Sequence, residues 1–368
     1  MRNAAKSLVL ILVAVALLLA GCGNRGGSSQ GSGSGSGDLP SNVPDQIREK
    51  WPIKIMVIRK IGGDDHTAQY LAGAKEEGEK MGFTVDTFSA NGDSAKFHDA
   101  IQQAMNQDYD GIIISHGDDE ATIDEVRQIV DKGIPVVTFD SIDGLKDIPG
   151  VTMTAQDDFA LAEMSLGQLV KDFNGQAKIV YLWVDGFPPM VRRNQVYQRI
   201  LQENPGIQEL DRFGVAAADT PVQTQNAVAA MLTKYPKGEL DAIFATWDAF
   251  AIGATRALNE AGRQEVKIYG IDVSNADLQA MQEENSPWVA TAAVDPKMIG
   301  AVNVRLLAKK IAGEDTPATY DLEANLITQE DLKKSSEPVN MVTLANIIPG
   351  WGQTDAFEEE WMKALKNR

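Results

Sequence analysis

The sequence predicts an α/β protein made of two doubly wound, parallel-sheet lobes. Short runs of β-branched and apolar residues recur along the chain, as in strands that are buried on both faces. Helical patterns, with apolar residues three and four positions apart, separate these runs. After the N-terminal segments about 330 residues remain, more than one hydrophobic core usually supports. We therefore expect two lobes with a ligand cleft between them.

The first 22 residues have the features of a secretory signal peptide. Arg2 and Lys6 precede a short apolar stretch, which ends in the sequence LAGC at residues 19–22. This ending resembles the lipobox of bacterial lipoproteins, in which the cysteine is lipidated and becomes the mature N-terminus. We expect residues 1–22 to be a lipoprotein signal peptide. Cys22, the only cysteine, is then the membrane anchor of an extracytoplasmic protein.

The segment after the cysteine has the composition of a tether. Residues 23–37 are almost wholly Gly and Ser, which behave as random coil. We expect residues 23–50 to be a flexible linker and lead-in. An engineered origin of the Gly-Ser repeat is the alternative.

The strands and helices alternate from residue 53 onward. Strands are expected at residues 53–58, 84–88, 111–115, 134–139, 179–183, 241–245, 267–270 and 289–293, and weaker ones near 151 and 207. Apolar residues at helical spacing predict helices around residues 97–105, 162–173 and 191–201.

Composition excludes several classes of function. The formal net charge of −18 argues against nucleic acid as a partner. The chain has three histidines and no paired cysteines, so we expect no metal site. It also has no phosphate-loop motif, and we expect no cofactor.

Polar and aromatic residues follow nearly every expected strand. Ligands of open parallel sheets bind beyond the carboxyl ends of the strands. Carboxylates, an arginine and tryptophans together are suited to a polyhydroxylated ligand, since they bind its hydroxyls and cover its C–H face. The candidate ligand-binding residues are Asp64, His66, Thr67, His116, Asp140, Ser141, Trp183, Arg193, Trp247 and Asp272.

Each of these residue types also has a simpler interpretation. An aspartate after a strand often N-caps the next helix, and this applies to Asp64, Asp157 and Asp248. The tryptophans are equally suited to packing, and the histidines to capping or to the surface. Arg193 also fits a surface ion pair, which contributes little to stability.

The chain resembles the ribose-type periplasmic binding proteins, the sugar receptors of ABC importers. The resemblance rests on the order and spacing of residues 70–78, 110–115, 133–140, 241–254 and 270–272. By position, Asp140, Arg193 and Asp272 match the ligand-binding aspartates and arginine of that family. The chain departs from the family at Ser141, where an arginine is common, and at Trp247, where an asparagine is usual. These departures make ribose itself an unexpected ligand.

The resemblance implies three crossings between the lobes, near residues 154, 294 and 325. The N-terminal lobe is then residues 51–154 plus 295–325, and the C-terminal lobe is residues 155–294 plus 326–345. Residues 346–368 lie beyond the resemblance. Phe357, Trp361 and Leu365 occur four residues apart, which predicts a C-terminal tail helix.

The expected function is that of a monomeric extracytoplasmic receptor and not of an enzyme. The resemblance implies that the lobes close over a monosaccharide or polyol and that the closed form docks on an ABC permease driven by its ATPase. One alternative is a receptor that presents a sugar or autoinducer to a sensor kinase. A remote alternative is a secreted glycoside hydrolase with Asp140 and Asp272 as its carboxyl pair.

Overall fold

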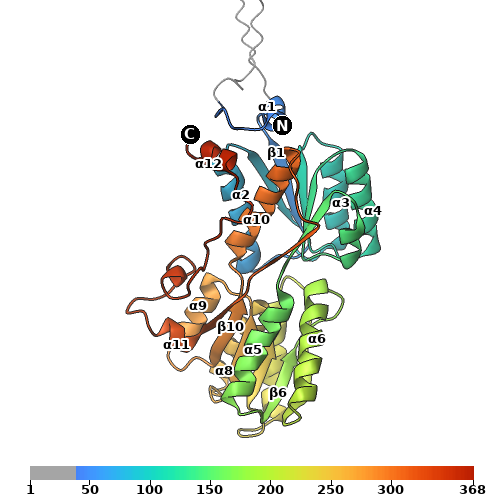
Figure 1. The fold of residues 1–368 in the computed structure, drawn as a ribbon. Coiled ribbons are helices and arrows are strands. Elements are labelled where there is room, and N and C mark those ends of the chain that lie inside the picture. The colour runs from blue at the N-terminus through green and yellow to red at the C-terminus, as the bar shows by residue number, and fades with distance from the viewer. Residues whose placement is uncertain (1–38) are drawn as a thin grey trace, which may run out of the picture. The chain divides into compact units, whose positions relative to one another are not determined.

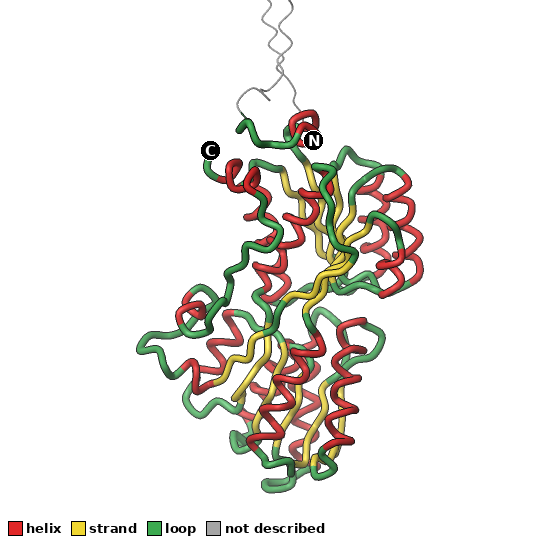
Figure 2. Tube along the Cα trace, in the orientation of Figure 1, coloured by secondary structure: helices red, strands yellow, loops and turns green. Residues whose placement is uncertain are grey.

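The computed structural model describes residues 39–368, so the predicted signal peptide, Cys22 and the Gly-Ser repeat lie outside the described residues. It contains two six-stranded sheets, each covered by helices on both faces (Figure 1). Figure 2 shows these strands in yellow, as two separate sheets between layers of red helices. The predicted α/β class with two doubly wound lobes is therefore confirmed.

The first lobe contains the sheet with strand order β11-β5-β4-β3-β1-β2, in which all strand pairs are parallel. Its strands are β1 (Lys54–Arg59), β2 (Thr84–Ser89), β3 (Gly111–Ser115), β4 (Val136–Phe139), β5 (Val151–Gln156) and β11 (Thr319–Leu322). Its helices are α1 (Asp45–Lys50), α2 (Asp65–Lys80), α3 (Ser94–Met105), α4 (Glu120–Asp131), the 3₁₀ helix η2 (Asp143–Asp147), α10 (Pro296–Ile311) and α12 (Glu360–Lys366).

The second lobe contains the sheet with strand order β12-β10-β9-β8-β6-β7, in which only the β10–β12 pair is antiparallel. Its strands are β6 (Ala177–Leu182), β7 (Ile207–Phe213), β8 (Ala242–Ala245), β9 (Lys267–Ile271), β10 (Trp288–Ala293) and β12 (Asn325–Thr328). Its helices are α5 (Asp158–Asp172), α6 (Pro188–Glu203), α7 (Thr220–Lys234), α8 (Asp248–Glu260), α9 (Asn275–Gln282), α11 (Gln329–Leu332) and the 3₁₀ helix η3 (Thr343–Asn346).

The strands are continuously apolar because both faces of each sheet are covered. In β3, Ile113 joins the core under α2 and α10, while Ile112 and Ile114 join the core under α3 and α4. Successive side chains of a strand point to opposite faces, so a strand between two helical layers needs apolar residues at every position. This explains why the strand runs were recognisable in the sequence.

Helices α2 and α10 approach each other closely through two glycines. A Cβ on Gly73 would lie 2.2 Å from the carbonyl oxygen of Lys297, and one on Gly300 would lie 2.3 Å from that of Tyr70. Only a residue without a side chain permits such backbone contact. This glycine pair holds α2, which begins at the cleft, against α10, which begins at the second crossing between the lobes.

The chain passes between the sheets between β5 and β6, between β10 and β11, and between β11 and β12. The structure adds a fourth passage after these three. Trp351 is buried in the second-lobe core, whereas Trp361 and Leu365 of α12 are buried in the first-lobe core. The tail expected as a helix over residues 346–368 is therefore helical only near its end, at Glu360–Lys366, and turns and irregular segments precede that helix.

The lead-in is not flexible throughout, contrary to the expectation for residues 23–50. Leu39, Val43 and Ile47 are buried in the first-lobe core, and α1 begins at Asp45. Burial of these apolar side chains fixes the segment. Within residues 39–368, no helix is long and apolar enough to cross a membrane.

Candidate functional site

The carboxyl ends of both sheets contribute residues to one cavity between the lobes, with an empty volume of about 450 Å³. The first lobe contributes Arg59, Ile61, His66, His116, Asp140 and Gln156, and the second lobe contributes Val184, Phe187, Met190, Arg193, Ala216, Trp247 and Asp272.

Three cavity residues have left-handed backbone conformations directly after a strand. The φ angles are +64° for His116 after β3, +47° for Asp140 after β4 and +73° for Asp272 after β9. Non-glycine residues adopt this conformation rarely, and such strain is concentrated at functional sites. The N–H of each residue still donates to a neighbouring strand, for example that of Asp140 to the carbonyl of Thr154 at 3.0 Å. In all three places the chain therefore turns at the residue that makes the last hydrogen bond of the strand.

The first-lobe wall contains buried polar atoms that lack partners. Within residues 39–368, His66 Nε2, Asp140 Oδ2 and Gln156 Oε1 make no hydrogen bond. Their side chains are almost fully buried, since the residues are 4%, 1% and 4% exposed. Because an unsatisfied buried polar group costs about 1–3 kcal/mol, a ligand that hydrogen-bonds to these atoms gains that free energy on binding.

Arg59 is also buried in this wall and is held by neutral groups. Its Nε donates to Thr67 Oγ1 at 3.1 Å and its Nη1 to Ser115 Oγ at 3.2 Å. The guanidinium lies over the ring of Tyr70, 4.8 Å from the centroid. A guanidinium has five N–H donors, so further donors remain for a ligand.

The second-lobe wall is built on a buried charge network. Arg193 Nε donates to Asp158 Oδ1 at 2.8 Å, and its Nη1 donates to the carbonyl of Thr246 at 2.5 Å and to Asp272 Oδ2 at 3.2 Å. Its Nη2 donates to Asp272 Oδ1 at 3.4 Å. These contacts use four of the five N–H groups of the guanidinium and leave one N–H of Nη2 without a partner among the described residues. The guanidinium cannot rotate without breaking the network, so the direction of this N–H is fixed.

Burial shifts the protonation of the cavity groups. Desolvation, with the negative charge of Asp158, raises the pKa of Asp140 to about 7 despite the nearby arginines. Desolvation and the Arg59 guanidinium hold the pKa of His116 well below its usual range, and desolvation also lowers that of His66. Both imidazoles are therefore neutral at pH 7, and each presents one donor and one acceptor.

The structure brings six of the predicted site residues to the cavity: His66, His116, Asp140, Arg193, Trp247 and Asp272. The other four lie outside its lining. Asp64 caps α2 by accepting from the N–H of Thr67 at 2.6 Å, and the Thr67 hydroxyl accepts from Arg59. Ser141 Oγ donates to the carbonyl of Phe139 at 3.1 Å. Trp183 Nε1 donates to the carbonyl of Met190 at 2.8 Å. These residues shape the walls.

Sequence reasoning did not single out Arg59, Gln156 or the apolar lining. Arg59 and Gln156 are the last residues of β1 and β5, so the strand-end rule applies to them as well. Phe187 and Met190 lie at the start of α6, where nothing in the sequence distinguishes them from core residues.

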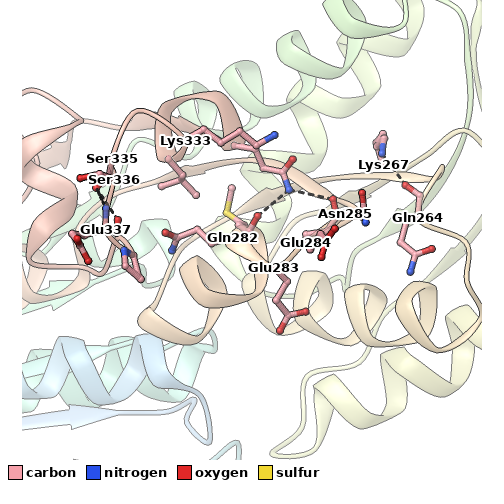
Figure 3. A pocket seen from close by; sticks show the side chains of 15 residues that line it. Gln264, Lys267, Gln282, Glu283, Glu284, Asn285, Lys333, Ser335, Ser336 and Glu337 are labelled. Carbon is pink, nitrogen blue, oxygen red and sulfur yellow. Dashed lines mark hydrogen bonds between the residues drawn. The ribbon is translucent and has the colours of Figure 1, made fainter.

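A larger groove lies on the second lobe, between the turn before β10 and the segment after α11 (Figure 3). Some of its polar groups bond to one another, as Figure 3 shows for Lys267 Nζ, which donates to the carbonyl of Gln264 at 2.8 Å. Ser335 Oγ likewise donates to the carbonyl of Glu337 at 2.7 Å. The second lobe alone lines this groove, whereas the cavity between the lobes is lined by both and contains buried unpartnered polar atoms, so we assign the candidate site to the cavity. No cluster of His, Cys, Asp and Glu suited to a metal ion occurs in the part of the chain that the structure describes.

Comparison with known proteins identifies the family. The family described as periplasmic binding protein domain matches residues 55–315. A sugar ABC transporter structure from Yersinia enterocolitica subsp. enterocolitica 8081 is 54% identical, covers 88% of this chain and 98% of its own, and has a TM-score of 0.86. The 5-methylthioribose transporter solute-binding protein of Thermotoga lettingae TMO is 34% identical, with coverages of 86% and 98% and a TM-score of 0.81.

Curated proteins match a comparable length of the chain. The ribose import binding protein of Escherichia coli (strain K12) is 24% identical over 263 residues, which are 70% of this chain and 84% of that protein. The predicted resemblance to ribose-type receptors is thereby confirmed. The chain belongs to the periplasmic binding protein family, as a sugar-type transport receptor and not as an enzyme.

Proposed function

We propose that this protein is the extracytoplasmic receptor of an ABC importer and binds a monosaccharide or polyol between its lobes. The observation that carries this proposal is the set of unpartnered atoms on His66, Asp140 and Gln156. Hydroxyl groups both donate and accept, so one polyol satisfies carboxylate, amide and imidazole atoms together. A purely apolar ligand leaves all three without partners.

Contacts between the lobes support a closing mechanism. Arg192 of α6 lies 3.6 Å from Asp140 and 3.7 Å from Asp143, both on the first lobe. The N–H of Asn275, in the second lobe, donates to Asp65 Oδ2 of the first at 3.2 Å. Ligand contacts to both walls add to these pairs and favour the closed form, which is then presented to the permease.

The ligands of two relatives suggest which class of ligand to propose for this chain. The Thermotoga lettingae relative was crystallised with 5-methylthioribose, and the Escherichia coli relative is a ribose import protein. We propose a pentose or a pentose-sized polyol as the ligand of this chain. We also propose that Cys22 carries the lipid anchor that holds the receptor at the membrane.

The test is a titration of purified protein, followed by calorimetry and by thermal unfolding, with pentoses, hexoses and polyols. A ligand that binds only the folded state raises Tm by mass action. Asp140→Ala should weaken its binding by about 2–5 kcal/mol, since it removes one partner of a desolvated polar contact. Absence of any Tm shift and of binding heat across the whole panel contradicts the proposed function.

A further inference from the structure

The two walls of the cavity differ in chemical character. Among the described residues that line the cavity, the buried atoms without partners are on His66, Asp140 and Gln156, all of the first lobe. The apolar lining residues, except Ile61, all belong to the second lobe: Val184, Phe187, Met190, Ala216 and Trp247. A ligand between these walls meets unpartnered hydrogen-bonding atoms on the first lobe. On the second lobe it meets the Arg193–Asp272 pair and, beside that pair, hydrocarbon and aromatic surface.

We propose that the ligand is amphipathic, namely a pentose-sized polyhydroxylated molecule that carries an apolar substituent of the size of an alkylthio group. This inference rests on the receptor function proposed above and specifies its substrate class. The hydroxyl-bearing part faces Asp140, Gln156 and His66. The substituent lies against Phe187 and Met190.

The order of residues on α6 sets the direction of the ligand. Met190 and Arg193 are three residues apart on one helix, so their side chains lie on the same face. Both line the cavity. A ligand whose hydroxyl accepts from the free N–H of Arg193 therefore extends its next atoms over Met190.

The apolar wall is held in place before any ligand arrives. The carbonyl of Met190 accepts from Trp183 Nε1 at 2.8 Å, and its sulfur accepts from Thr246 Oγ1 at 3.3 Å. Trp247 packs edge-on against Phe250, with ring centroids 5.6 Å apart. A hydroxyl placed against the side chains of Val184, Phe187 and Met190 finds no acceptor there and loses its bonds to water. The wall therefore selects against a fully hydroxylated sugar.

The experiment compares two probes of the same ring form by isothermal titration calorimetry. Neither 5-deoxyribose nor 5-methylthioribose has a 5-hydroxyl, so both exist as furanoses and differ only by the methylthio group. The methylthio probe should bind at least about tenfold tighter, as expected for burying two methylene-sized groups. Ribose should bind more weakly than the methylthio probe.

Variants locate the substituent. Met190→Gln keeps the side-chain length but adds an amide, and should reduce the tenfold preference to less than about threefold. Met164→Gln on α5, half-buried and outside the cavity, is the matched control and should preserve the preference. Thermal unfolding of each variant establishes that it is folded. A preference unchanged in folded Met190→Gln overturns the placement of the substituent.

The possible outcomes distinguish this inference from the receptor function on which it rests. Equal binding of both probes, or tighter binding of ribose or a hexose, overturns the amphipathic ligand and leaves the sugar receptor standing. Failure of every pentose, hexose and polyol to bind overturns the receptor proposal as well.

Discussion

Arg193 and Asp272 form a buried ion pair at the base of the second-lobe wall, with Nη1 and Oδ2 3.2 Å apart. Asp158 holds the Nε of the same guanidinium. Desolvation of three charges is offset only because each carboxylate contacts the arginine with good geometry. The cleft therefore depends on Arg193, because its removal leaves the buried Asp272 without its paired arginine.

Arg193→Ala should lower the free energy of unfolding by about 3–5 kcal/mol, because it leaves the buried charge of Asp272 unpaired and removes one of the two arginines that pair with Asp158. It should also abolish detectable ligand binding. Arg193→Lys should retain only part of the stability and only part of the ligand affinity, since an ammonium cannot reproduce the planar fork of hydrogen-bond donors. Urea unfolding and calorimetry measure the two effects. The control is Arg199→Ala on the same helix, whose ion pairs are exposed and worth less than about 1 kcal/mol. Equal effects at both positions contradict the assignment.

Ligand binding should strengthen as pH rises through the pKa of Asp140, about 7. Below this pKa the carboxyl is protonated and offers a poorer acceptor to ligand hydroxyls, so affinity should fall by up to about tenfold per pH unit. Calorimetric titrations between pH 5 and pH 8 measure the slope. In Asp140→Asn the slope should vanish, whereas the exposed Asp124→Asn should keep it. A pH-independent affinity in the unmodified protein contradicts this prediction.

The same shift makes folding stability depend on pH in the opposite direction. The pKa of Asp140 is raised in the folded state, so its stabilising contribution is complete below the unfolded value near 4 and is lost as pH rises to about 7. Without ligand, Asp140→Asn should therefore be more stable than the unmodified protein at pH 8, by on the order of 2–4 kcal/mol as an upper limit. Urea unfolding at pH 5 and pH 8 measures the difference. Equal stability of the two proteins at pH 8 contradicts this account of the carboxyl.

Arg192 joins the lobes and should bias the free receptor toward closure. It is anchored in the second lobe by Asp158, with its Nε 2.8 Å from Oδ2, and approaches Asp140 and Asp143 of the first. Arg192→Gln should raise the radius of gyration of the ligand-free protein in small-angle scattering. Affinity should fall about three- to tenfold, because ligand must then supply more of the closing free energy. Arg127→Gln, on the first-lobe surface, is the control. An unchanged radius in both variants shows that Arg192 does not hold the lobes together.

The strands and the strand-end acids could be predicted because their signals are local. A strand buried on both faces is apolar at every position, as β3 is, and Asp140 and Asp272 directly follow such strands. β11 and β12 were not predicted, because they are four-residue strands with mixed burial. Phe187 and Met190 lie at the start of α6, and this part of the helix lines the cavity only because the first lobe lies opposite it. That contact joins residues far apart in sequence, and no local pattern encodes it.

The C-terminal segment should stabilise the first lobe and restrain the hinge. Trp361 is buried in the first-lobe core and its Nε1 donates to Glu314 Oε1 at 2.8 Å, while Arg305 Nη1 donates to the carbonyl of Thr354 at 2.8 Å. Trp361→Ala should therefore cost about 3–5 kcal/mol of stability, through lost burial and the cavity left behind. The control Lys363→Ala, on the exposed face of the same helix, should change stability by less than about 0.5 kcal/mol.

Truncation tests the restraint separately from the packing. Figure 1 shows that the segment after η3 runs from the second lobe to α12 beside the first. Removing residues 353–368 should increase the radius of gyration of the ligand-free protein beyond that of Trp361→Ala, because truncation also cuts the fourth passage between the lobes. Small-angle scattering on both folded variants makes the comparison. If the two radii agree and exceed that of the unmodified protein, loss of the α12 contact accounts for the loosening and the connection itself restrains nothing.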